Sequence, residues 1–417
     1  VGGNITWLSV GRGVQGIGRG GLMILSRAII AEVVPARERG RYVGVMGGVF
    51  GLSEVLGQLL GGWFTEGPGW RWAFWMNIPL GIIAIGVAIY FLDIPKKSVK
   101  FRWDYLGTFF MIVAATSLIL FTTWGGSQYE WSDPIIIGLI ITTIVAAALL
   151  VVVELRAKDP LVPMSFFQNR NFTLTTIAGL ILGIAMFGII GYLPTYLQMV
   201  HGINATEAGY MLIPMMVGMM GTSIWTGIRI SNTGKYKLFP PIGMIVTFVA
   251  LIFFARMEVS TTLWQIGIYL FVLGVGLGLA MQVLVLIVQN TLPTAVVGSA
   301  TAVNNFFRQI GSSLGSALVG GMFVGNLGTL MEERMPAAMA QLSPEEQAAM
   351  AAQGGLDSNE LTPAIVNQLP TVLHDAFAGS YNDALIPVFY VMMPLIGIAL
   401  LLLLFIKQEK LRETTTD

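Results

Sequence analysis

The chain has 417 residues, of which 55% are hydrophobic and only 11% are charged, and its mean hydropathy is +0.74. Soluble domains carry about 25% charged residues, so this composition excludes a soluble protein and predicts an integral membrane protein. The net charge of zero gives no support for nucleic acid as a partner, and the absence of cysteine excludes disulfides and thiolate metal sites. No phosphate-loop motif and no nucleophile–base pair is present, so we expect neither an enzyme nor a bound cofactor.

The apolar runs are continuous, which predicts a bundle of helices rather than a porin-type barrel of alternating segments. A membrane-spanning helix needs about 20 mostly apolar residues, and the chain offers about eleven such stretches. Their expected ranges are 5–34, 41–64, 72–93, 104–125, 134–154, 172–198, 206–229, 238–256, 261–290, 296–325 and 384–406.

Lysine and arginine are concentrated in every second connection of this series. The basic connections are 35–41, 94–103, 155–171, 230–237 and the C-terminal tail. The positive-inside rule places all of them, and therefore the C-terminus, in the cytoplasm of a multi-pass cell-membrane protein. The long acidic segment 326–383 then lies outside, as a solvated loop or as an extracytoplasmic cap, and the solvated loop is favoured.

The first helix carries an unusual polar face. Arg12, Gln15, Arg19 and Ser26 recur at helical spacing, and Arg27 follows near the predicted cytoplasmic end. An arginine at the bilayer centre costs roughly 2.5–3.5 kcal/mol on insertion scales, so it is expected to face protein or a water-filled cavity. Arg12 and Arg27 are close enough to the helix ends to reach an interface, whereas Arg19 is not.

Glu54 in the second helix is the expected partner of Arg19. Counted inward from the loop 35–41, both residues lie roughly 20 Å deep. Three alternatives remain open: a structural ion pair, a carboxylate that binds and releases a proton during a cycle, or two groups that do not meet. Burial favours the neutral form of a glutamate, and a nearby arginine favours the charged form.

Glycine recurs at four-residue spacing in the stretch GVMGGVFGLSEVLGQLLGG, and again at Gly16–Gly20 and Gly311–Gly315. Small residues at this spacing allow two helices to approach closely. Several such pairs beside charged residues favour helices that slide or rock.

Several motifs resemble the major facilitator superfamily, and in particular its fourteen-helix drug:proton antiporters (the EmrB/QacA type). They are GRGVQGIGRGG, IIAEVVPARERGRYVGVMGGVFGLSEVLGQLLGG, WRWAFWMNIPLG, YLPTYLQMVHGINATEAGYMLIP, SNTGKYK and GSATAVNNFFRQIGSSLG. The resemblance implies an all-α polytopic bundle of two six-helix halves with two extra helices between them. It also implies that the family's first three helices are missing from this chain, which would leave about eleven of fourteen. The resulting units are 1–93, the rest of the N-terminal half; 94–171, the extra pair; and 172–417, the C-terminal half with the loop 326–383.

The resemblance also assigns candidate site residues. Arg12 matches an arginine of a family motif implicated in proton transfer, and the antiporter motif G-P-x-x-G-G is matched by Gly57, Gln58, Gly61 and Gly62. Gln58 replaces the proline of that motif, which would otherwise bend the helix. Arg19 and Glu54 occupy positions that are usually small or mildly polar, so the pair is a specialisation or an introduced change.

In facilitator folds the two halves face each other across a central cavity near the midplane. The residues expected to line it are Gln15, Tyr192, Tyr196, Gln282, Asn304, Asn305 and Arg308. Aromatic side chains suit flat or cationic substrates, although most aromatic residues of such a protein face lipid. For Arg308 a structural hydrogen bond is favoured over a role in gating.

These features predict a monomeric secondary transporter that exports small amphipathic drugs or dyes in exchange for protons, as in antibiotic resistance. One alternative is a dedicated exporter of one metabolite or lipid. The other is a truncated paralogue that does not transport and serves as a scaffold in the bilayer.

Overall fold

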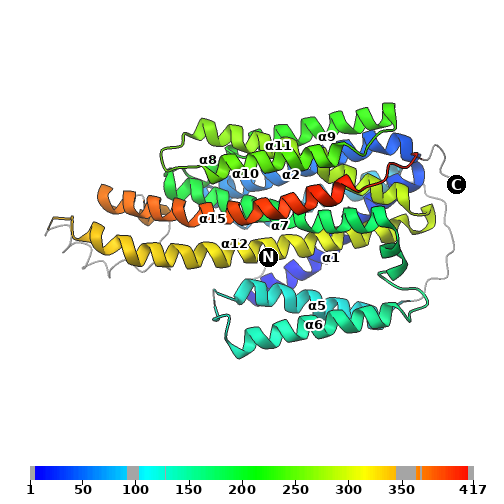
Figure 1. Cartoon of the computed structure of the whole chain (residues 1–417), viewed down its shortest axis with the longest axis horizontal. Coiled ribbons are helices and arrows are strands. Elements are labelled where there is room, and N and C mark those ends of the chain that lie inside the picture. Colours follow the sequence, from blue (N-terminus) through cyan, green and yellow to red (C-terminus); the bar gives the residue numbers. More distant parts are fainter. Residues whose placement is uncertain (1–4, 92–102, 127, 344–362, 367–368, 412–417) are drawn as a thin grey trace.

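The computed structural model describes residues 5–91, 103–126, 128–343, 363–366 and 369–411, which are helical over most of their length (Figure 1). Every predicted apolar stretch coincides with a helix, and the all-α membrane bundle is confirmed. The long helices are α1 (Ile5–Val33), α2 (Ala36–Glu66), α4 (Asn77–Phe91), α5 (Tyr105–Trp124), α6 (Pro134–Glu154), α7 (Arg170–Val200), α9 (Ile213–Thr233), α10 (Phe239–Ala255), α11 (Leu263–Thr291), α12 (Val297–Met339) and α15 (Thr371–Leu404). The short ones are α3 (Trp72–Trp75), η1 (Met164–Gln168), α8 (Ala205–Tyr210), η2 (Thr294–Val296) and α14 (Pro363–Val366).

Among the described residues, 8 helical stretches are long and apolar enough to cross a membrane, fewer than the expected eleven or so. α10 is apolar but shorter. α1 and α2 have sufficient length, but their many glycines, together with Arg12 and Arg19 in α1, lower their hydropathy. These helices therefore need protein contacts or hydrated surroundings more than the others do.

The C-terminal half is the best-packed part of the molecule. α7, α9, α10, α11, α12 and α15 contact one another in turn around one continuous apolar core. α11 runs through its centre and buries every residue from 276 to 290. A helix that is largely apolar on all sides is typical of a protein core or a membrane span, and α11 is both over these residues.

α5 and α6 form a hairpin that lies along one side of this half and contacts it through α12 (Figure 1). The Thr143 hydroxyl donates to Ser117 Oγ at 2.8 Å between the two helices. Both helices begin with an aspartate cap: Asp104 accepts from the Gly107 N–H and Asp133 from the Ile135 N–H. Such caps satisfy backbone donors that have no partner within the helix.

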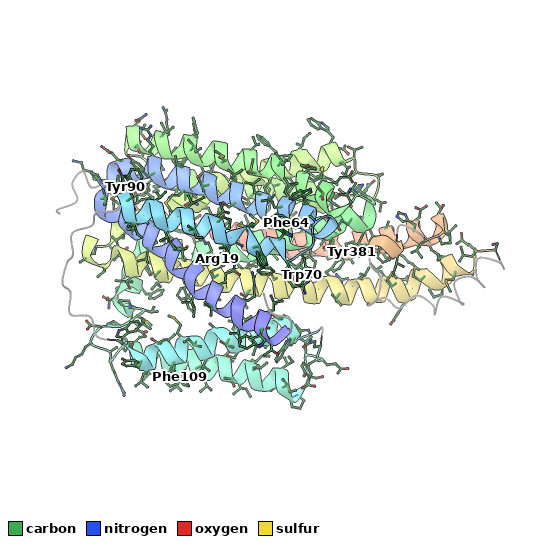
Figure 2. All side chains as sticks on the ribbon, turned by 180° about the vertical axis from the view of Figure 1, so that it is seen from behind. Arg19, Phe64, Trp70, Tyr90, Phe109 and Tyr381 are labelled. Carbon is green, nitrogen blue, oxygen red and sulfur yellow. The ribbon has the colours of Figure 1, made fainter. Side chains whose placement is uncertain are left out.

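The N-terminal helices are packed less evenly. α2 lies along α8, α9 and α11, whereas α1 crosses the bundle diagonally and touches α12 and α2 (Figures 1 and 2). α4 has no buried residue. The N-terminal part therefore meets the C-terminal half mainly through one helix, α2.

α12 and α15 extend beyond the other helices at one end of the molecule (Figure 1). α12 has 43 residues and is about 65 Å long, about twice the thickness of a bilayer core. The segment 326–383, expected as a solvated loop, is therefore helical over 326–339 and 371–383. Apolar contacts between the two extensions and an ion pair from Arg334 to Asp383, at 2.7 Å, hold them together. The proposed surface helix in PEEQAAMAAQ lies outside the described residues.

Candidate functional site

The closest contact between the N- and C-terminal parts is built on glycine. The Ser223 hydroxyl of α9 donates to the Gly44 carbonyl of α2 at 3.2 Å. A methyl group added at Gly47 would collide with Gln282 of α11, and one at Gly48 would meet Met220 at 2.8 Å. These glycines thus allow α2 to lie directly against α9 and α11, as their spacing predicts.

The antiporter-motif positions further along α2 differ from one another. None of the described atoms lies within 4 Å of a methyl group added at Gly57 or Gly61, whereas one added at Gly62 would lie 3.2 Å from the Ala205 backbone. Among the described residues, α2 is therefore closely packed around Gly44, Gly47 and Gly48 and again at Gly62, and less so at Gly57 and Gly61. The side chain of Gln58 lies outside the described residues, so its effect on the helix stays a prediction.

Arg12 of α1 makes two contacts, one with an amide and one with an aromatic ring. Its guanidinium donates to Gln15 Oε1 at 2.9 Å and lies 5.8 Å from the centre of the Phe74 ring. Arg12, Gln15 and Arg19 are all exposed, and Figure 2 shows Arg19 midway along α1. The side chains of Arg27 and Glu54 lie outside the described residues, so the pairing of Arg19 with Glu54 stays a prediction.

A row of buried polar side chains runs along the first half of α12. Arg308 Nη2 donates to Asn305 Oδ1 at 2.7 Å, and Asn304 donates to the Thr176 hydroxyl of α7 at 3.2 Å. Asn304, Asn305 and Arg308 are at most 9% exposed. The structural hydrogen bond expected for Arg308 is therefore present. In this conformation the three side chains are enclosed, and their place in a substrate cavity stays a prediction.

α11 adds two buried glutamines, of which Gln282 is one of the predicted cavity residues. Gln282 lies at the contact with α2, and Gln289 donates to the Thr301 hydroxyl at 3.4 Å. The side-chain carbonyl oxygens of both glutamines are buried and accept no hydrogen bond from the described residues. An unsatisfied buried acceptor costs about 1–3 kcal/mol, so these two oxygens are available to a further hydrogen-bond donor.

Tyr192 and Tyr196 are one turn apart on α7 and have different environments. Tyr192 lines a cavity of about 390 Å³ between α5, α7 and α12. Tyr196 is completely buried, and its hydroxyl donates to Asn382 Oδ1 of α15 at 2.9 Å. Tyr196 is therefore part of the core in this conformation.

The cavity beside Tyr192 combines hydroxyl groups with apolar surface. It is lined by Ile119, Thr122, Thr123, Gly125, Gly126, Tyr192, Ser313, Ser316, Ala317, Gly320, Gly321 and Val324. Its volume lies within the range of about 300–1,000 Å³ that is usual for small-molecule sites. A lining without charged side chains suits an uncharged or weakly polar amphipathic molecule. Of the residues predicted to line the central cavity, Tyr192 is the one that lines this cavity among the described residues. The others do not meet here.

The C-terminal tail forms a clamp that sequence analysis missed. Asn171 exchanges two hydrogen bonds with the Lys407 backbone, at 2.9 and 3.0 Å. Gln408 donates to the Gly234 carbonyl at 2.9 Å, and the Glu409 N–H donates to the Tyr236 hydroxyl at 2.8 Å. The tail thus joins the start of α7 to the α9–α10 turn and brings three of the predicted cytoplasmic connections to one end. No local sequence signal marks this clamp because its partners are distant in the chain.

Comparison with known proteins decides the family. The family model described as Major Facilitator Superfamily matches residues 1–316. This chain belongs to the major facilitator superfamily. Members of this superfamily are transporters, which agrees with the multi-pass helical bundle and with the expectation that the protein is not an enzyme.

Related facilitators include proteins named for drug efflux. The chain is 31% identical to the multidrug transporter protein MdtP of Bacillus subtilis, over 98% of this chain and 77% of that protein. It is 32% identical to the efflux pump roqT of Penicillium rubens, over 92% of this chain and 70% of that protein.

An uncharacterized MFS-type transporter of Mycobacterium tuberculosis is 36% identical over 99% of this chain. The chain spans only 58% of that relative's length. A solved bacterial homologue of the human lysosomal transporter Spinster has a TM-score of 0.42 and 14% identity, with 92% of each chain covered. That likeness is too loose to add to the family assignment.

Proposed function

We propose that this protein is a proton-coupled secondary transporter that exports small amphipathic compounds by alternating access. The observation that carries the proposal is the 31% identity to a multidrug transporter over nearly the whole chain. The membership in a transporter family makes movement of a solute the default expectation, and the relatives named as efflux pumps favour export.

The packing of α2 supports alternating access. Its glycines contact α9 and α11 with little side-chain volume between the backbones, at Gly44, Gly47 and Gly48. An interface of this kind can slide or rock without unpacking large side chains. At Gly57 none of the described atoms lies within 4 Å of an added methyl group, so the described part of the chain leaves room there for such a movement.

The cavity beside Tyr192 supports an amphipathic substrate class. Its hydroxyl groups and its apolar surface suit a molecule with a few polar atoms on an apolar body. A broad substrate range agrees with this lining better than a single charged metabolite does, because no charged side chain there selects one ion.

Proton coupling would supply the energy. One proton that moves inward through 100 mV releases about 2.3 kcal/mol, in addition to any pH difference. Glu54 in α2 is the proposed carrier because it lies within a helix that also forms the interface with α9. Arg12 and Arg19 on α1 would favour its charged form when they approach.

The test uses proteoliposomes that contain the chain, with an imposed inward pH gradient, ethidium, and a neutral lipophilic drug. We expect gradient-dependent movement that a protonophore abolishes and that Glu54→Gln reduces at least tenfold. Glu130→Gln is the matched control because Glu130 is an exposed carboxylate in the α5–α6 turn, and it should transport normally.

Each possible outcome supports or contradicts one of the alternative functions. Movement that persists in Glu54→Gln leaves export standing and contradicts the role of Glu54. Movement of one compound in a broad panel identifies a dedicated exporter of a metabolite or lipid. A folded protein that moves nothing contradicts transport by this chain and favours a scaffold.

A further inference from the structure

Two carboxylates meet at the open end of the α5–α6 hairpin. Asp104 precedes α5, and Glu154 is the last residue of α6. A methyl group added at Gly107 would collide with Asp104 Oδ2 and would lie 2.8 Å from Glu154 Oε1. Both oxygens lie within 2.8 Å of one point, the place that a Cβ of residue 107 would occupy, so the two carboxylates face the same space over the Gly107 backbone.

Each carboxylate uses its other oxygen to bind the backbone. The Gly107 N–H donates to Asp104 Oδ1 at 2.8 Å, and the Val162 N–H donates to Glu154 Oε2 at 3.0 Å. The two facing oxygens, Asp104 Oδ2 and Glu154 Oε1, are buried and receive no hydrogen bond from the described residues. The Glu154 side chain is 3% exposed, so water does not replace the missing donor freely.

No positive charge among the described residues offsets this pair. Arg156 and Lys158 are the basic residues that follow Glu154, and their side chains are exposed to solvent. The ion pairs of the described chain join other residues. Two ionised carboxylates in this position would repel each other in a site of low polarity, and such pairs characteristically retain a proton.

We propose that Asp104 and Glu154 bind one proton between them, in an O–H···O⁻ hydrogen bond from one carboxyl group to the other. The proton comes from water at this end of the molecule, and the pair then carries one negative charge in place of two. The arrangement satisfies both buried oxygens at once. Charge-assisted hydrogen bonds of this kind are short and roughly twice as strong as neutral ones.

The shared proton also stabilises the attachment of the hairpin. Glu154 holds the backbone of Val162, which packs in a small apolar cluster with Phe172 of α7 and Val288 of α11. The Ser299 hydroxyl of α12 bonds to the neighbouring Leu161 carbonyl at 3.4 Å. Loss of the proton would place two negative charges at this junction and weaken the contact between the hairpin and the C-terminal half.

This protonation site is independent of the proposed transport. It concerns the end of the hairpin and does not involve Glu54 or the α2 interface. A failure of proton-coupled export would leave it intact, and its own failure would leave export untouched.

Infrared spectroscopy of the full chain in liposomes tests the shared proton directly. We expect a C=O stretching band of a buried carboxylic acid at neutral pH, which shifts in D₂O and disappears on alkaline titration. Both Asp104→Asn and Glu154→Gln should abolish it, because an amide then donates to the remaining carboxylate. Asp133→Asn is the matched control: Asp133 caps α6 in the same way at the opposite end of the hairpin, and its variant should keep the band.

Two results would overturn the proposal. A band that survives in both variants belongs to another group. A band that Glu154→Gln removes and Asp104→Asn retains belongs to Glu154 alone, and the proton is not shared.

Thermal unfolding gives a second measurement that does not depend on assigning a band. A pair that binds a proton in the folded state more tightly than in the unfolded state stabilises the protein at lower pH, and this contribution is lost as the pH rises. The wild-type midpoint should therefore fall from neutral to alkaline pH more steeply than that of Glu154→Gln, whose amide is a permanent donor. Parallel profiles of the two proteins would contradict the shared proton.

Discussion

α1 and α12 carry the same two sequence features and bury them to opposite extents. Each helix has an arginine bonded to an amide three residues away, Arg12 with Gln15 and Arg308 with Asn305. Each also has a G-x-x-x-G pair. On α12 both features are buried against α7, whereas residues 9–22 of α1 are exposed throughout. A G-x-x-x-G pair therefore indicates only that a helix can be packed closely. Whether it is packed closely depends on whether another helix lies against it, as α7 does against α12.

Substitution of the glycines provides the first test of this comparison. An added methyl group at Gly311 would collide with the Leu180 backbone, whereas none of the described atoms lies within 4 Å at Gly16. We expect Gly311→Ala to destabilise the protein by about 1–3 kcal/mol because α7 must move away. Gly16→Ala should be neutral or stabilising by up to about 1 kcal/mol, since alanine is the better helix former. Thermal unfolding in detergent measures both, and equal losses would contradict the difference in packing.

The two arginine–amide pairs provide the next test. Asn305→Ala removes a buried charge-assisted bond and should cost about 1.5–3 kcal/mol. Gln15→Ala removes an exposed bond of the same spacing and should change stability by less than about 0.5 kcal/mol. Chemical unfolding of the purified variants compares them. A loss in Gln15→Ala that matches the loss in Asn305→Ala would show that the exposed face of α1 is covered in the folded protein.

The same contrast between buried and open environments separates two neighbouring tyrosines of α7. Tyr196→Phe removes the buried hydrogen bond to Asn382 and should cost about 1 kcal/mol of stability with little change in substrate affinity. Tyr192→Ala removes a wall of the 390 Å³ cavity and should weaken substrate binding more than it weakens the fold. Dye binding measured beside thermal unfolding distinguishes them. A reversed pattern would show that Tyr196 lines the substrate path and that the cavity beside Tyr192 does not.

The sequence predicted the helices well because apolar length alone marks a spanning segment. It missed the continuation of α12 because Glu332, Glu333 and Arg334 resemble a solvated loop. The apolar face of this extension was nevertheless visible, since Leu327, Met331 and Met335 recur at four-residue spacing. Its partners on α15 could not be predicted from α12, because the pairing depends on how the chain returns.

The candidate site was predictable in its residue types but not in its assembly. Arg308 and Tyr192 were identified by position, yet only the structure shows that one is enclosed and the other lines a cavity. The Asp104–Glu154 pair escaped notice because each carboxylate alone resembles an ordinary helix-end residue. Contacts between distant segments decide such features, and a single sequence does not contain them.

His201 gives the smallest expected effect and tests burial at the C-terminal end of α7. It caps α7 outside the spanning segment and lies against the Tyr196 ring, at 5.8 Å between centres. Burial lowers the pKa of His201 below its ordinary value because the charged form is poorly solvated. The unfolded chain therefore binds more protons at mildly acidic pH, and stability falls as the pH drops below about 6.5.

His201→Gln removes the titrating group and should flatten the acidic side of the stability profile by a fraction of a kcal/mol. Asp383→Asn is the comparison, since it alters an exposed carboxylate and leaves the imidazole in place. Unfolding midpoints between about pH 7 and about pH 5 measure the difference, over the range in which histidine titrates. If wild type and His201→Gln lose stability equally on acidification, the imidazole is hydrated in the folded protein. The buried part of α7 would then end at Val200 and would not include His201.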